Sequence, residues 1–256
     1  MTDLESLKEK LVRLRLKTMA QQLDFLLDQA AQKNLNLTDV INRLADYELE
    51  ARRQTAITLR YRQSLLNDKP TIDQFDFHHH KSRLDQKTLI LNLFSLDFIS
   101  KHQDAIFIGN PGTGKTFLAK ALIYAACNAN IKCLFTNTMD MINHLIAAEA
   151  DQSLLKKLHY YQSPDLLVCD ELGYLALGPQ GSHLFFQVIS QRHEVKSTLL
   201  TTNLPFADWG KVFDSTPVAT AIADRLVHNS EVLILEGPSY RRKKKGLICK
   251  LNYGGK

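Results

Sequence analysis

The stretch Gly109-Asn110-Pro111-Gly112-Thr113-Gly114-Lys115-Thr116 matches the pattern G-x-x-x-x-G-K-[ST] at every fixed position. The apolar run 105–108 before it is typical of a buried strand, and residues 117–122 after it have the apolar face of a helix. A glycine-rich turn between a strand and a helix N-terminus presents backbone N–H groups to an anion. Residues 109–117, Phe117 included, are therefore predicted to bind a nucleotide, with Lys115 reaching its β and γ phosphates and Thr116 ligating Mg²⁺.

A phosphate loop occurs in kinases, GTPases and ATPases alike, so the residues that hold the metal and activate water are needed to tell them apart. Residues 165–171 form a short apolar run that ends in two carboxylates, Asp170 and Glu171. The end of such a strand lies at the carboxyl edge of a sheet, beside the phosphate loop. Adjacent strand residues point opposite ways. Asp170 is thus predicted to hold the Mg²⁺ shell, and Glu171 to orient or deprotonate the attacking water.

Two further polar residues follow apolar elements. Asn203 ends the run 197–202 and precedes Pro205, where an amide either hydrogen-bonds the attacking water or the γ-phosphate, or simply caps a turn. Arg225 lies near the end of a predicted helix, just before a strand at 232–235. It would neutralise charge in phosphoryl transfer if it reached the nucleotide of a neighbouring subunit. The alternative role of Arg225 is that of a partner in an ion pair on the surface.

The ordered set of motifs resembles the IstB-type ATP-binding proteins that accompany the transposase of certain bacterial insertion sequences. These proteins are a branch of the AAA+ ATPases close to the DnaC-like helicase loaders. Besides the phosphate loop, the resemblance rests on the segments 75–77, 96–99, 170–174, 185–192, 201–205, 224–226 and 237–241. It implies that Asn203 senses the γ-phosphate, that Arg225 acts on a neighbouring subunit, and that the chain forms ATP-dependent homo-oligomers on DNA.

The region after the last predicted strand is short. About 20 residues follow Leu235, too few for the helical lid that many AAA+ proteins carry. No C-terminal lid domain is therefore expected, and Arg241 is a weak candidate for the nucleotide-sensing arginine that a lid would supply.

The charge distribution fits a nucleic-acid partner. The 256 residues contain 32 Lys+Arg and 27 Asp+Glu, a net charge of +5. Positive charge concentrates at two places, which are predicted to contact the DNA backbone or else to be solvated surface: Lys8, Arg13, Arg15 and Lys17 near the start, and Arg241-Arg242-Lys243-Lys244-Lys245 near the end.

Other features exclude alternatives. The four cysteines have no zinc-site spacing, and the sequence shows neither a signal peptide nor a run long enough to span a membrane. A cytoplasmic protein without a membrane partner is expected. The consecutive residues His78, His79 and His80 are poorly placed to share one tetrahedral metal ion.

The predicted organisation has three parts. Residues 1–67 form a small all-helical module, with helices over 2–33 and 38–66, that contacts DNA or another subunit; residues 68–83 form a linker; and residues 84–256 form the ATPase domain with its basic tail. The alternation of strands and helices predicts a three-layer α/β core with a mainly parallel five-stranded sheet. A helix over 138–161 falls between the second and third strands.

The motifs are compatible with three functions. The leading one is an ATPase, expected to be stimulated by DNA, that assembles on duplex DNA and presents a target to a transposase. A helicase loader would use the same core with a replicative helicase as its partner. A small-molecule kinase has no need for a water-activating pair such as Glu171 and Asn203.

Overall fold

The computed structural model describes residues 2–241. The chain divides into two compact units, Met1–Leu59 and Arg60–Lys256. No helix within the described part is both long enough and apolar enough to cross a lipid bilayer.

The first unit is built from helices. They are α1 (Asp3–Arg13), α2 (Lys17–Lys33) and α3 (Leu37–Gln63), whose last residues belong to the second unit. A small core of Leu23, Leu26, Val40 and Leu44 joins α2 to α3. The carboxylate of Glu48 accepts hydrogen bonds from the backbone N–H groups of Thr18 and Met19, at 2.9 and 3.2 Å, and so satisfies the open N-terminus of α2.

The helix predicted over residues 2–33 is interrupted in the structure. Arg15 takes a left-handed conformation with φ of 60°, and the N–H of Leu16 bonds back to the carbonyl of Leu11 at 2.9 Å. This is the hydrogen-bonding pattern of a helix C-terminus. The break lets α1 fold back on α2, so that the half-buried Leu4 and Leu11 reach the small core of the unit.

The second unit contains a sheet of five parallel strands in the order β2-β3-β4-β1-β5. The strands are β1 (Asp104–Gly109), β2 (Cys133–Asn137), β3 (Leu166–Leu172), β4 (Ser197–Thr202) and β5 (Ser230–Leu235). The helices are α4 (Lys81–Asp85), α5 (Lys87–Leu93), α6 (Asp97–Ser100), α7 (Lys115–Asn128), α8 (Thr138–Ala150), α9 (Leu154–Gln162), α10 (Gly178–Arg192) and α11 (Thr216–His228), with short 3-10 turns at Ile72–Gln74, Phe77–His79 and Phe206–Lys211.

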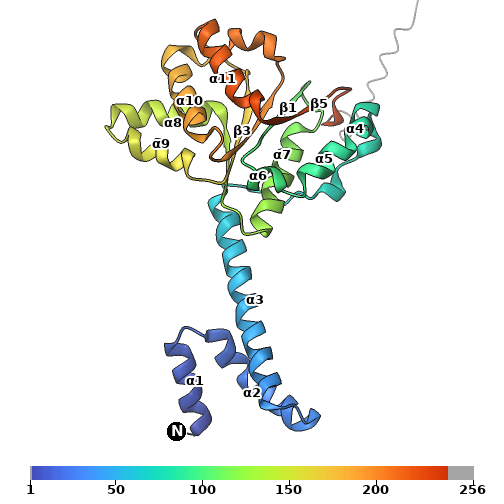
Figure 1. The fold of residues 1–256 in the computed structure, drawn as a ribbon, viewed down its shortest axis with the longest axis vertical. Coiled ribbons are helices and arrows are strands. Elements are labelled where there is room, and N and C mark those ends of the chain that lie inside the picture. The colour runs from blue at the N-terminus through green and yellow to red at the C-terminus, as the bar shows by residue number, and fades with distance from the viewer. Residues whose placement is uncertain (1, 242–256) are drawn as a thin grey trace, which may run out of the picture. The chain divides into compact units, whose positions relative to one another are not determined.

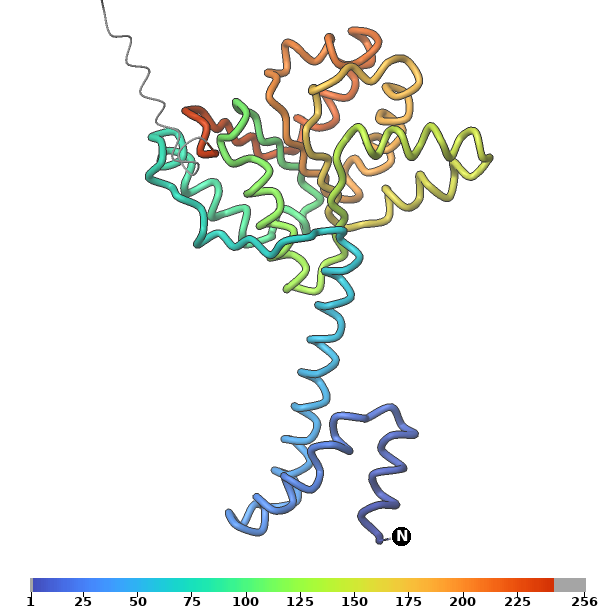
Figure 2. Tube along the Cα trace, turned by 180° about the vertical axis from the view of Figure 1, so that it is seen from behind, coloured from blue at the N-terminus to red at the C-terminus, as the bar shows by residue number. Residues whose placement is uncertain are grey.

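Helices cover both faces of this sheet (Figure 1; seen from behind in Figure 2). Consecutive strand residues face opposite sides: Leu166 and Val168 pack into the core under α5, α6 and α7, whereas Leu167 and Cys169 pack into the core under α8 to α11. A three-layer α/β fold results, and the predicted fold class is confirmed. Within residues 2–241, β5 is followed by no further strand and by no lid domain.

The helix predicted over 138–161 is also interrupted. Gln152 is left-handed, with φ of 56°, and the N–H of Ser153 bonds to the carbonyl of Ala148 at 2.8 Å, which ends α8 and starts α9. The polar triplet Asp151-Gln152-Ser153 is the sequence signal for this break.

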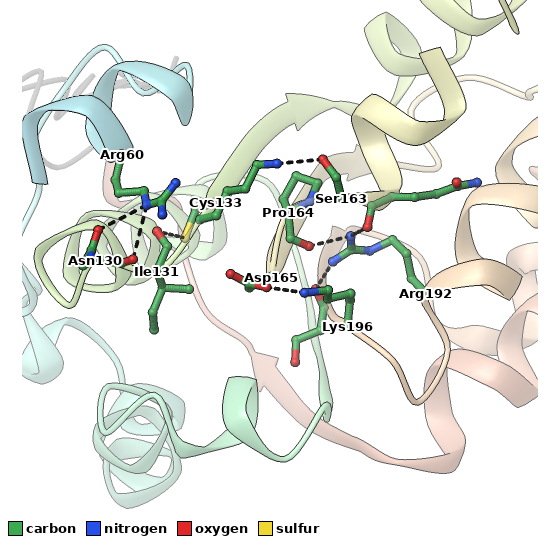
Figure 3. A network of polar contacts seen from close by, with 12 residues as sticks. Arg60, Asn130, Ile131, Cys133, Ser163, Pro164, Asp165, Arg192 and Lys196 are labelled. Atoms are coloured by element: carbon green, nitrogen blue, oxygen red, sulfur yellow. Dashed lines mark hydrogen bonds and ion pairs between the residues drawn. The ribbon is translucent and has the colours of Figure 1, made fainter. Parts of the chain in front are cut away.

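A buried arginine organises the amino ends of the central strands (Figure 3). Arg192, at the end of α10, is 1% exposed, and burial lowers its pKa to about 10. Its guanidinium donates hydrogen bonds of 2.5–3.2 Å to the carbonyl oxygens of Tyr161, Gln162, Pro164 and Ser197 and to the hydroxyl of Thr198. Nearby, Lys196 pairs with Asp165. These bonds tie α9, β3 and β4 together at the edge opposite the phosphate loop.

Candidate nucleotide-binding site

The phosphate loop links the end of β1 to the start of α7. Gly112 and Gly114 have φ of 83° and 107°, a region that side chains rarely adopt. A Cβ atom on Gly114 would lie 2.8 Å from the ring of Phe75, so the close approach of this ring also requires glycine. Inside the loop, Thr113 Oγ1 donates to the carbonyl of Asn110 at 2.8 Å. The loop is thus fixed in a shape that only its glycines allow.

Lys115 lies within the curve of this loop. Its Nζ donates to the carbonyl oxygens of Gly109 and Asn110 at 2.6 and 3.1 Å. Burial lowers the pKa of its ammonium, while the carboxylates of Asp170 and Glu171 act in the opposite direction. A polyphosphate in the loop would offer stronger acceptors than these carbonyls, and the positive charge already sits where it would bind.

The carboxylate of Asp170 meets Thr116 across the site. The Thr116 hydroxyl donates to Asp170 Oδ1 at 3.1 Å, and the Thr201 hydroxyl donates to the same oxygen at 2.5 Å. Two adjacent ligands of an octahedral Mg²⁺ with bonds of 2.0–2.1 Å are about 2.9 Å apart. The hydroxyl oxygen of Thr116 and the carboxylate oxygen of Asp170 therefore fit the Mg²⁺ that the sequence predicts for this position.

Glu171 reaches the site through an irregularity in its strand. The pairing of β3 with β4 shifts register between Cys169 and Leu172, and Glu171 has φ of 61°. Its N–H donates to Thr201 Oγ1 at 3.0 Å, and its carboxylate accepts from the amide of Asn137 at 2.8 Å. Simple strand alternation, on which the sequence interpretation rests, does not describe this bulge, which re-aims the side chain.

A small hollow brings together Glu171 and Asn203, two of the residues predicted for hydrolysis. It has a volume of about 30 Å³, and its lining includes Lys115, Thr116, Glu171, Asn203 and Arg241. The buried Oδ1 of Asn203 has no hydrogen-bond partner within residues 2–241. A buried acceptor without a partner favours an incoming donor, such as a water, at this point.

A larger hollow of about 540 Å³ adjoins the same loop. Its walls come from three separated parts of the chain: Gln74, Phe75, Asp76 and Arg83; Gly112, Gly114, Lys115, Thr116 and Phe117; and Tyr240 and Arg241. The rings of Phe75 and Phe117 stack with centroids 6.1 Å apart. Aromatic walls beside a phosphate loop suit the base of a nucleotide.

Arg83 holds this hollow together. It is 2% exposed, and its guanidinium donates to the carbonyls of Asp76 and Thr113 at 2.7 and 2.8 Å. It also lies 4.4 Å from the ring centre of Phe75 and 5.2 Å from that of Tyr240. Sequence reasoning missed Arg83, Gln74 and Tyr240; for the first two, the polar stretch before residue 84 is typical of a linker.

Residues 237–241 lie over the phosphate loop as a strap. The N–H of Tyr240 donates to the carbonyl of Gly112 at 2.9 Å, and a Cβ on Gly112 would lie 2.1 Å from the hydroxyl oxygen of Ser239. The ring of His79 packs edge-on against Tyr240, with centroids 5.0 Å apart, and its Nε2 lies 3.1 Å from the carbonyl oxygen of Pro238. The segment 237–241, which the sequence identifies only as a motif, is therefore part of the nucleotide site.

Arg225 is placed elsewhere on the same unit. Its Nη1 donates to the carbonyl of Ala221 at 2.9 Å, and its guanidinium lies 4.7 Å from the ring centre of Phe186. Arg225 lines neither of the two hollows beside its own phosphate loop.

The residues predicted to contact DNA fall in both units. In the first unit, Arg13, Arg15 and Lys17 are exposed, and Lys8 pairs with Asp24 at 2.5 Å. Arg241 lines both nucleotide hollows, whereas Arg242, Lys243, Lys244 and Lys245 lie outside the described residues.

Comparison with known proteins places this geometry in a family. The solved structures include the DnaC helicase loader, with a TM-score of 0.55 and 22% identity over 69% of this chain and 98% of that one. Another is AMPPCP-bound DnaA from Aquifex aeolicus, with a TM-score of 0.58 and 18% identity; the match covers 71% of this chain and 56% of that one. At such identities they show a shared fold alone.

Sequence relatives are much closer. The putative ATP-binding protein of insertion sequence IS232 from Bacillus thuringiensis subsp. berliner is 34% identical over 93% of this chain and 95% of its own length. The putative ATP-binding protein of insertion sequence IS21 from Pseudomonas aeruginosa is 35% identical over 94% of this chain and 91% of its own length. Residues 9–247 match the family described as IstB-like ATP binding protein. The chain therefore belongs to the family of IstB-like ATP-binding proteins of insertion sequences.

Proposed function

We propose that this chain is an Mg²⁺-dependent ATPase that assembles on duplex DNA and helps the transposase of its insertion sequence to select or receive target DNA. Membership of the IstB-like family supports the link to transposition, because its relatives are named as ATP-binding proteins of insertion sequences. The chemistry is supported by the residues around the phosphate loop.

ATP would occupy both hollows. The base would lie in the 540 Å³ hollow against Phe75 and Tyr240, and the triphosphate would follow the loop toward Lys115. The N–H groups at the start of α7 and the positive end of this helix would face the phosphates.

The observation that carries hydrolysis is the convergence of Glu171 and Asn203 on one hollow with Lys115 and Thr116. Thr116 and Asp170 would hold Mg²⁺, which when bound neutralises charge on the phosphate oxygens. Glu171 would take a proton from the attacking water, and the amide oxygen of Asn203 would orient that water. Lys115 would stabilise the negative charge that develops on the γ-phosphate.

Arg225 would complete the site of a neighbouring subunit. It lines neither nucleotide hollow of its own chain, and within residues 2–241 its guanidinium lies over the ring of Phe186 and pairs with no carboxylate. An arginine that contacts the γ-phosphate across a subunit boundary links hydrolysis to assembly. The proposal therefore includes an ATP-dependent homo-oligomer.

Duplex DNA would be held through its phosphates. The exposed Arg13, Arg15 and Lys17 and the basic run that starts at Arg241 are the proposed contacts, together with Lys8 once its pair with Asp24 opens. Contacts of this kind carry little sequence preference.

The decisive experiment is a titration of labelled duplex and single-stranded oligonucleotides with and without a non-hydrolysable ATP analogue. The proposal expects duplex binding that the analogue strengthens, because a ligand that favours the assembled state is reciprocally linked to whatever that state binds. The bound assembly should then stimulate strand transfer by the transposase encoded in the same element. Preference for single strands together with binding to a replicative helicase would instead identify a helicase loader.

A further inference from the structure

Next to the small hollow of the nucleotide site, two apolar side chains project from the loop between β3 and α10. Tyr174 and Leu175 are 58% and 63% exposed. Tyr174 lines the same hollow as Glu171 and Asn203. The loop is held close to the sheet by Gly173, where a Cβ would lie 2.7 Å from the side chain of Leu204. Tyr174 and Leu175, called the knob below, are thus presented on a fixed base.

On the α10–α11 side of the same unit lies an open apolar hollow of about 270 Å³. It is lined by His183 and Phe186 of α10 and by Pro217, Val218 and Ala221 of α11. Phe186 joins this hollow to Arg225, because its ring also lies under the guanidinium. Burying an exposed tyrosine or leucine in such a hollow is favourable, whereas leaving both surfaces in water is not.

We propose that the knob of one subunit docks into this hollow of a second copy of the chain, and that this contact brings Arg225 to the first subunit's nucleotide. The inference rests on the proposed function, because it assumes that Arg225 acts across a subunit boundary. It adds the surface that makes this action specific: a head-to-tail contact between two different faces of the same protein.

The spacing of the two faces agrees with this contact. Ala221, in the hollow, precedes Arg225 by one helical turn, a rise of about 6 Å. At the knob, Glu171 and Tyr174 are three residues apart in a bent loop and line the same small hollow, a separation of at most about 10 Å. The knob can therefore occupy the hollow while Arg225 reaches the nucleotide beside it.

Charge favours the same partner. Around the small hollow, Glu171 lies beside Lys115 and Arg241, so the knob face becomes negative only when the triphosphate of ATP is bound, whereas Arg225 brings positive charge to the face with the apolar hollow. Opposite signs attract the two faces and like faces repel, so the pairing is directional. Because the triphosphate supplies much of the negative charge, assembly should require nucleotide.

The test uses two variants that remove one face each. Leu175→Ser shortens the knob at an exposed position, and Val218→Phe fills the hollow with an apolar side chain. The matched control is Leu155→Ser, an 84% exposed leucine on α9. Assembly is followed without DNA by sedimentation velocity over a range of protein concentrations, with and without a non-hydrolysable ATP analogue.

We expect wild-type protein and Leu155→Ser to assemble with nucleotide, and each face variant to need about 10-fold or more higher concentration. An equimolar mixture of Leu175→Ser and Val218→Phe should form dimers at concentrations at which neither variant assembles alone, because one intact knob meets one intact hollow. The contact is overturned if both variants assemble like the wild type, or if mixing gives no dimer.

A cross-linking experiment locates the contact independently of its strength. Leu175→Cys and Val218→Cys are prepared as separate proteins in a Cys249→Ser background, mixed, and treated with a short bismaleimide. The native Cys127, Cys133 and Cys169 are buried and should not react in the folded protein. We expect a cross-linked dimer when both variants and nucleotide are present, and its absence while the mixture assembles would overturn the contact.

Failure of this inference can be told from failure of the proposed function. If the wild type assembles with nucleotide and Arg225→Ala loses hydrolysis while both face variants behave normally, only the knob contact is wrong. If the wild type neither assembles nor hydrolyses ATP, both proposals are wrong.

Discussion

The amide of Asn137, at the end of β2, donates a 2.8 Å hydrogen bond to the carboxylate of Glu171, at the end of β3. The oxygen of the same amide accepts from the N–H of Met139 at 2.9 Å and caps α8. Asn137 therefore joins the start of a helix to the residue proposed to activate water. The position of Glu171 thus depends on an edge strand that β3 and β4 separate from β1 and its phosphate loop.

Glu171→Gln should separate ATP binding from ATP turnover. The glutamine oxygen can still accept from Asn137, so the loop and the nucleotide hollow should keep their shape, but the base is removed. We expect unchanged ATP affinity and a turnover rate lower by about 10²- to 10⁴-fold. Isothermal titration and a phosphate-release assay measure the two quantities. Normal hydrolysis by this variant would disprove the assignment of Glu171.

Lys115→Ala and Arg225→Ala should fail for different reasons. The first loses the ammonium inside the phosphate loop and should not bind ATP, whereas the second should bind ATP but hydrolyse it poorly. Mixing them should restore part of the activity, because a Lys115→Ala subunit lends its arginine to an intact loop. If co-assembled mixtures remain inactive, Arg225 acts within its own chain or only supports the structure.

Arg83→Met should weaken nucleotide binding without removing the catalytic groups. The variant keeps an apolar stem against Phe75 but loses the hydrogen bonds to the carbonyls of Asp76 and Thr113. A hydrogen bond from a charged donor is worth about 1.5–3 kcal/mol, and losing these two bonds releases the segment of Phe75 and Asp76 from the phosphate loop, so KM should rise about 10-fold or more with a smaller change in kcat. Lys81→Met, exposed on the same short helix, is the control. A fall in kcat alone would contradict a binding role.

Asp104→Asn should make stability less sensitive to pH. Burial raises the pKa of Asp104 from 3.8 to about 7, against the opposing effects of the Thr198 N–H and of Arg192. Because the folded-state pKa is raised, the stability contributed by the protonated form is fully present below pH 3.8 and is lost as the pH rises through about 7.

The charged carboxylate should therefore cost up to about 4 kcal/mol at pH 8, a cost that asparagine does not have. The melting temperature of Asp104→Asn relative to the wild type should rise between pH 5 and pH 8. Asp151→Asn, at an exposed position, should show no such trend. A constant difference across this range would mean that Asp104 is ionised in the folded protein at pH 5.

Replacing the basic run by glutamine should weaken all duplexes alike. Because Arg241 also lines the nucleotide hollows, the informative variant changes Arg242, Lys243, Lys244 and Lys245 and keeps Arg241. The slope of log affinity against log salt should flatten by about 0.9 for each DNA phosphate that the variant no longer neutralises. An unchanged slope would exclude the run from the DNA interface.

The parts of the fold that the sequence predicts are those with local signals. The phosphate loop is recognisable because Gly109, Gly114 and Lys115 are fixed in spacing by the anion they surround, and the strands alternate with helices of clear period. The prediction of one continuous helix over residues 2–33 is wrong, because Arg15 enters the left-handed region without a glycine or proline nearby to signal the break.

The parts of the site that the sequence does not predict depend on packing between distant segments. Arg83, Gly114 and Tyr240 meet in space, but none of them carries a local pattern that reveals the others. Likewise the bulge that redirects Glu171 depends on the hydroxyl of Thr201 in the next strand. The positions of these side chains are set by packing between segments that are distant in the sequence. The family resemblance identifies the segment that contains Tyr240 as a motif, but it gives that residue no role.

The position of β5 has a consequence for how the protein is made. During synthesis, β1 and its phosphate loop leave the ribosome long before β5 and before the strap that covers Gly112. In the finished sheet, β1 lies between β4 and β5. Until then β1 is an edge strand whose free backbone groups can pair with another chain. A product that stops before Ser230 would carry an intact phosphate-loop motif and yet be prone to aggregate, with one wall of its nucleotide pocket missing.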